Sequence, residues 1–66
     1  MTRQESIAAI LAASNDEGTI QATDMLALSQ DGAIPNDPRL HTTTHVVYAL
    51  RAAGLTDDEI NAALDD

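Results

Sequence analysis

Oxygen-bearing side chains gather around a single glycine, Gly18, near the beginning of the chain. The stretch from Ala13 to Asp24 reads A-S-N-D-E-G-T-I-Q-A-T-D. Carboxylate, amide and backbone carbonyl oxygens are the ligands that calcium prefers, and the ion takes six to eight of them. A central glycine supplies the sharp turn that lets side chains on either side converge. These residue types point to a turn that binds a cation.

The spacing around Gly18 follows the calcium-loop template, which places ligands at positions 1, 3, 5, 7, 9 and 12 and glycine at position 6. With Gly18 at position 6, ligand positions 3 to 12 are held by Asn15, Glu17, Thr19, Gln21 and Asp24. The stretch resembles an EF-hand loop, and G-T-I-Q-A-T-D-M-L-A-L is most similar to the loop and exiting helix of dockerin-type repeats. The resemblance implies a helix–loop–helix turn in which Ile20, at position 8, packs against a partner loop.

One ligand of the template is missing. Position 1 is Ala13, where the family has aspartate, so an oxygen and a negative charge are absent. Position 12 is Asp24, which is shorter than the glutamate that grips calcium with both oxygens. We therefore expect a degenerate EF-hand-like loop that binds calcium weakly or not at all. An ordinary polar turn between two helices is the alternative.

Two histidines form a second candidate metal site. His41 and His45 are four residues apart, and Asp37 precedes His41 by the same interval, so a helix would place them on one face. This spacing is compatible with zinc or nickel. The sequence identifies no further ligand, which favours two partly exposed histidines near a helix start.

Catalysis has little support. The chain has no cysteine, its three serines lie in no nucleophile-elbow motif, and no glycine-rich phosphate loop is present. A chain of 66 residues is also too small to enclose a substrate pocket of ordinary size. We expect a protein that is not an enzyme and needs no cofactor.

The net charge of the chain restricts the classes of partner that it can bind. Eleven acidic residues face three arginines and no lysine, which gives a net charge of −8. Direct binding to nucleic acid or to an anionic membrane needs a cationic surface, so both are excluded. A basic protein partner fits this charge. No apolar run approaches the ~20 residues of a membrane span, and no secretion signal begins the chain. The expected setting is soluble and cytoplasmic.

Local start and stop signals divide the chain into helices. Thr2–Glu5 and Thr56–Glu59 have the spacing of a capping box, and Gly32 and Gly54 suit the left-handed residue that ends a helix. Apolar spacing predicts helices over residues 2–14, 22–30, 38–53 and 56–64, with Thr19 or Thr23 capping the second. The predicted fold is all-α, one domain over residues 1–66, a small bundle of about four short helices.

The third predicted helix contains conflicting signals. Asp37–Pro38 is a favoured helix start, because the aspartate caps and the proline occupies the first position. Thr42–Val47 is mostly β-branched, and the alternation from Leu40 to Tyr48 also fits a strand. We predict a helix, with the strand as the alternative.

The predicted function is that of a small acidic protein–protein interaction module that docks through an apolar face rimmed by carboxylates. A core without Phe or Trp buries little apolar surface, so binding to a protein partner or forming a homodimer would add stability. The predicted contacts are Met25, Leu26, Leu28 and Tyr48 among apolar residues and Asp57, Asp58 and Glu59 among acids. One alternative is an acidic inhibitor, such as a viral one, that mimics nucleic-acid phosphates to block a basic partner. Another is a weak calcium- or zinc-responsive binder.

Overall fold

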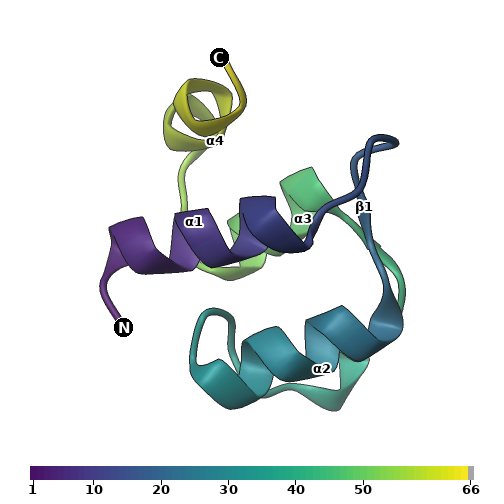
Figure 1. Ribbon diagram of the computed structural model, residues 1–66. Coiled ribbons are helices and arrows are strands. Elements are labelled where there is room, and N and C mark those ends of the chain that lie inside the picture. Colours follow the sequence, from purple (N-terminus) through teal and green to yellow (C-terminus); the bar gives the residue numbers. More distant parts are fainter. Residues whose placement is uncertain (66) are drawn as a thin grey trace.

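The computed structural model describes residues 1–65, which form four α-helices and a short two-stranded antiparallel ribbon at one side of the molecule (Figure 1). In chain order the elements are α1 (Arg3–Ala13), β1 (Thr19–Ile20), α2 (Ala22–Asp31), the 3-10 turn η1 (Pro38–Leu40), β2 (Thr44–His45), α3 (Val46–Ala52) and α4 (Asp57–Leu64). The prediction of a mostly helical domain is confirmed. The prediction of a purely all-α fold is wrong, because β1 and β2 form a sheet.

Capping chemistry sets the helix ends. In both predicted capping boxes the threonine hydroxyl accepts the backbone N–H three residues on, at 3.2 Å, and the glutamate accepts the threonine N–H at 2.9 Å. Gly32 and Gly54 have φ of 85° and 99° and end α2 and α3, as predicted. The cap of α2 differs from the prediction: Gln21 occupies that position and its side chain makes no capping bond.

The third predicted helix is divided. Asp37 caps only the single turn of η1, since its carboxylate accepts the Arg39 N–H at 3.0 Å. Thr44 Oγ1 then donates to the Thr42 carbonyl at 2.8 Å, which is the side-chain competition that disfavours helix in such residues. The helix begins again at Val46, where the His45 ring accepts the Val47 N–H at 3.2 Å.

The ribbon joins the two halves of the chain. Thr19 pairs with His45 and Ile20 with Thr44, and the Val46 N–H donates to the Gly18 carbonyl at 2.8 Å. Gly18 has φ of 78°, a conformation that L side chains rarely adopt. Figure 1 shows β1 leading from the end of α1 into α2, which runs back in the opposite direction to α1.

The core is aliphatic and draws on every helix. Its buried residues are Ile10, Ile20, Met25, Leu28, Ala33, Ile34, Val46, Ala49, Leu50, Leu55 and Ile60. Ile10, Ile20, Met25 and Leu50 are its largest fully buried side chains. Tyr48, the one aromatic residue of the chain, lies outside the core with 60% of its surface exposed.

Ile20 supports both the ribbon and the core, so its truncation tests this packing. We predict that Ile20→Ala lowers the free energy of unfolding by about 2–5 kcal/mol, measured by urea denaturation. The matched control is Leu26→Ala, on the exposed side of α2, which removes a side chain of equal size and is expected to cost less than about 1 kcal/mol. Equal losses in the two variants would contradict the central place of Ile20.

Candidate functional site

The turn between α1 and α2 is organised by the side chain of Asn15. Its Oδ1 accepts three donors, the backbone N–H groups of Glu17 and Thr19 at 2.9 and 3.0 Å and the Thr19 hydroxyl at 3.1 Å. The Asn15 N–H donates to the Thr19 carbonyl at 2.9 Å. This is the local bonding by which asparagine stabilises turns. These four hydrogen bonds connect the two sides of the turn.

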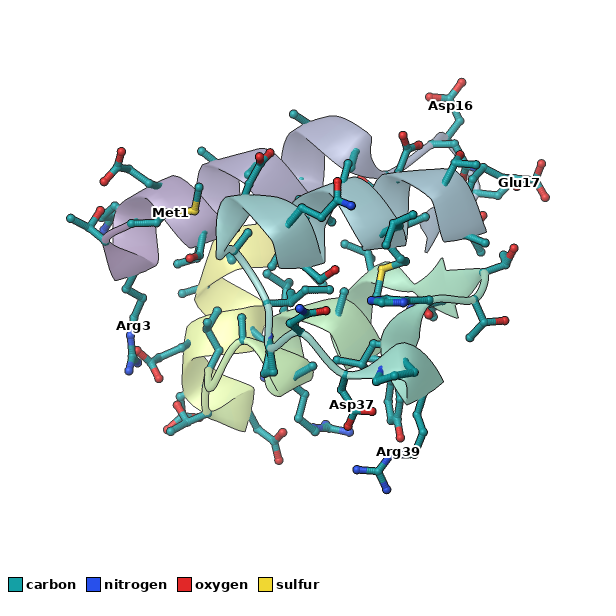
Figure 2. All side chains as sticks on the ribbon, turned by 90° about the horizontal axis from the view of Figure 1, so that it is seen from below. Met1, Arg3, Asp16, Glu17, Asp37 and Arg39 are labelled. Atoms are coloured by element: carbon teal, nitrogen blue, oxygen red, sulfur yellow. The ribbon has the colours of Figure 1, made fainter. Side chains whose placement is uncertain are left out.

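Of the other predicted calcium ligands, Thr19 is half-buried and bonded to Asn15, whereas Glu17, Gln21 and Asp24 lie at the surface. Figure 2 shows the Asp16 and Glu17 side chains pointing outward at the tip of the turn. Gln21 and Asp24 are also exposed. Within residues 1–65 no three or more His, Asp or Glu side chains lie close enough together to hold a metal. The EF-hand resemblance remains a prediction.

The two histidines serve separate structural contacts. They share no helix, because α3 begins after His45, so the predicted common face is wrong. The Nε2 of His41 lies 3.0 Å from Ser29 Oγ, whose proton goes to the Leu26 carbonyl at 2.8 Å. The His41 ring therefore donates to Ser29. His45 uses its Nδ1 as the cap of α3.

The predicted partner-binding residues divide between core and surface. Met25 and Leu28 are buried in the core, whereas Leu26 on α2 and Tyr48 on α3 are 40% and 60% exposed. The predicted acids Asp57, Asp58 and Glu59 form the first turn of α4. Asp57 pairs with Arg51 at 2.9 Å, while Glu59 pairs with Arg3 on α1.

Tyr48 lines a shallow groove of about 210 Å³ with Leu40, Arg51 and Ala52. Residues 48, 51 and 52 are three and four positions apart, so one side of α3 presents all of them. The prediction placed Leu40 and Tyr48 in one continuous helix, whereas the structure places Leu40 in the separate turn η1. Sequence reasoning identified Tyr48 but not its neighbours, although the helical spacing of Arg51 and Ala52 was visible.

Two acid–arginine pairs flank this groove. Arg51, in its wall, bonds Asp57, and Arg39, next to Leu40, bonds both oxygens of Asp37, the closest at 2.7 Å. The side chain of Arg39 and then its backbone N–H lower the pKa of Asp37 to about 2. The same hydrogen bond, and then the negative charge of Asp37, raise the pKa of Arg39. Figure 2 shows Asp37 and Arg39 side by side at the edge of the molecule.

All three arginines of the chain form ion pairs with acids. Arg3, Arg39 and Arg51 each form an ion pair, and no arginine or lysine occurs between residues 4 and 38. The segment from α1 to α2 therefore carries uncompensated acids, namely Glu5, Asp16, Glu17, Asp24 and Asp31. The molecule has a charge-balanced groove and, elsewhere, an acidic surface.

Comparison of the chain with protein-family models, curated proteins and solved structures finds no significant match. Within residues 1–65 no helix is long and apolar enough to cross a membrane.

Restoring the missing position-1 carboxylate tests the EF-hand prediction. We predict that the natural chain binds calcium weakly or not at all and that Ala13→Asp brings the dissociation constant to about 1 mM or below, the range of weak EF-hand sites. Calcium titration of the Gly18 amide resonance measures this. Ala12→Asp, one residue outside the loop, is the matched control for added charge. If Ala13→Asp gives no calcium-dependent shift at Gly18 at ~10 mM, ten times the weak end of that range, the turn is an ordinary polar one.

Proposed function

We propose that the protein is a cytoplasmic, non-enzymatic interaction module that docks a protein partner through the Tyr48 groove. Of the predicted contacts, this groove keeps Tyr48 and, at its rim, Asp57, and the proposal adds Leu40, Ala52 and Asp37 to them. Each acid forms an ion pair with an arginine, so the rim presents both charges side by side. The module needs no cofactor for this role.

The exposure of Tyr48 carries the proposal. A chain with a thin aliphatic core gains stability from burying an aromatic side chain, yet its one aromatic residue is 60% exposed. Tyrosine combines a large apolar ring with a hydroxyl and is enriched at protein interfaces and their energetic centres. Leu40 and Ala52 extend the apolar surface beside it. A partner that covers this groove would supply the burial that the monomer does not.

Site-specific photo-crosslinking tests the proposal. A benzophenone amino acid in place of Tyr48 is expected to give covalent adducts in native extract, and the same group in place of Leu26 on α2 is expected to give few. Excess wild-type chain should compete the adducts away, and excess Tyr48→Ala chain should compete at least ~10-fold less well, since loss of an interface hot spot costs 2 kcal/mol or more. Equal labelling at both positions, or none at either, would contradict docking at Tyr48.

The acidic inhibitor is a second candidate, and the distribution of charge favours it. Every arginine is already paired, so acids from α1 to α2 are free to face a basic partner. Asp24 and Asp31 lie seven residues apart in α2, a rise of about 10.5 Å, on the same side of the helix. Such carboxylates would stand in for phosphates.

Salt and a paired set of variants separate the two candidates. Binding driven by these acids should weaken steeply as salt rises, and the double change Asp24→Asn with Asp31→Asn should weaken it further. Docking through the groove should respond little to salt and mainly to Tyr48→Ala. The variant that weakens capture of the crosslinked partner therefore identifies the surface in use.

A further inference from the structure

We infer that His45 makes the junction between the ribbon and α3 sensitive to acid, because protonation of its ring releases the first turn of α3. This inference goes beyond the proposed function and does not depend on it. His45 is the last residue of β2, and α3 begins at the next residue, Val46. A histidine at this place couples the protonation state of one ring to the start of a helix.

The hydrogen bond that caps α3 requires a neutral ring. The Nδ1 of His45 accepts the backbone N–H of Val47 at 3.2 Å, so this nitrogen uses its lone pair and carries no proton. The neutral ring therefore has its hydrogen on Nε2. When the ring is protonated, both nitrogens become donors, and Nδ1 can no longer accept. The added positive charge then lies at the N-terminal end of α3, where cations are unfavourable.

The ring of His45 also lies against the turn that precedes β1. Its Nε2 is 3.5 Å from the position that a Cβ atom on Gly18 would occupy. The Gly18 carbonyl accepts the Val46 N–H at 2.8 Å, and His45 itself pairs with Thr19 in the ribbon. The residue is exposed, so protons reach the ring from solvent. A ring that leaves the Val47 N–H on protonation therefore disturbs the point where the turn, the ribbon and α3 meet.

The other histidine provides an internal comparison, because its hydrogen bond has the opposite direction. The hydroxyl of Ser29 gives its proton to the Leu26 carbonyl, so the Nε2 of His41 donates to Ser29 Oγ. A protonated ring still donates from Nε2, and this bond survives in acid. The geometry thus assigns the acid sensitivity to His45 and not to His41.

Charged groups near His45 act against the loss of the cap. Neither residue of β1 is titratable, the turn before it carries Asp16 and Glu17, and α3 carries Tyr48 and Arg51. The two carboxylates attract a protonated ring, but they point outward at the tip of the turn (Figure 2), and Arg51 already pairs with an acid of α4. The excess of acids in the whole chain also favours protonation, by an attraction that 1 M salt screens to about 3 Å. The capping bond is a direct contact and is screened less.

The direction of the pH dependence follows from the number of protons bound in each state. Histidine in an unfolded chain has a pKa of about 6.5. Because the capping ring must be neutral, the folded state binds fewer protons than the unfolded state, and stability rises with pH. The contribution of the cap is complete above the histidine range and is lost as the pH falls through it. Hydrogen bonds from Arg39 hold the pKa of Asp37 at about 2, so this acid stays ionised throughout that range.

Urea denaturation of the full chain in 1 M sodium chloride tests this inference. From about pH 7.5 to about pH 5.5 we expect the equilibrium constant for unfolding to rise about threefold or more, since loss of an N-cap bond changes it by roughly fivefold once the ring is fully protonated. His45→Asn, whose amide oxygen caps a helix at either pH, should remove this dependence. His41→Asn is the matched control and should keep it.

The tautomer of His45 gives a second test that needs no variant. At about pH 7.5 the nitrogen-15 shifts of the ring should place its hydrogen on Nε2, and the Val47 amide resonance should move as the ring is protonated. A neutral ring with its hydrogen on Nδ1 would overturn the inference, as would a stability that is unchanged or higher in acid. A pH dependence that persists in His45→Asn, or that only His41→Asn removes, would also overturn it.

Discussion

The antiparallel pairing of Thr19–Ile20 with Thr44–His45 is the contact on which the arrangement of this chain depends. It is the one pairing of backbone strands in residues 1–65, and it joins segments about 25 residues apart in sequence. Ile20 places its side chain in the core from this ribbon, and Val46 continues from it directly into α3. Because the ribbon fixes the start of α3, it also determines that Ala49 and Leu50 turn inward while Tyr48 turns outward.

The distribution of charge follows from the same arrangement. The three arginines lie in α1, η1 and α3, and each pairs with an acid, so the two arginines near Tyr48 are balanced by acids while the segment from α1 to α2 carries an excess of acids. Surface ion pairs of this kind add little to stability. In the proposed docking role, these pairs lower the net charge at the rim of the groove.

Features that depend on neighbouring residues were predictable from the sequence. The capping boxes at Thr2 and Thr56 and the helix ends at Gly32 and Gly54 use bonds that span a few positions, and each lies where the pattern indicated. The division of the third helix was not predictable in this way. It depends on a partner strand far away in the sequence, which turned a local conflict between helix and strand signals in favour of a short strand.

The candidate site shows the same limit. Apolar residue types alone did not separate Met25 and Leu28, which are buried, from Leu26 and Tyr48, which are exposed. Helical periodicity predicts one buried face but not which surface residues gather beside it. The groove at Tyr48 is lined by Leu40 of η1 together with residues of α3, and η1 itself packs against α2, so the groove depends on contacts between separate elements.

Hydrogen exchange at the Val46 amide tests the central place of the ribbon most directly. This N–H donates to the Gly18 carbonyl at 2.8 Å and bridges the two halves of the chain. If the ribbon holds the fold together, Val46 should exchange only through global unfolding, with an exchange free energy equal to that from urea denaturation and to that of the core residue Leu50. The Gly18 amide, bonded only within the turn, should exchange faster. A Val46 amide that exchanges as fast as Gly18 while Leu50 stays protected would show that the halves pack without the ribbon, contradicting this account.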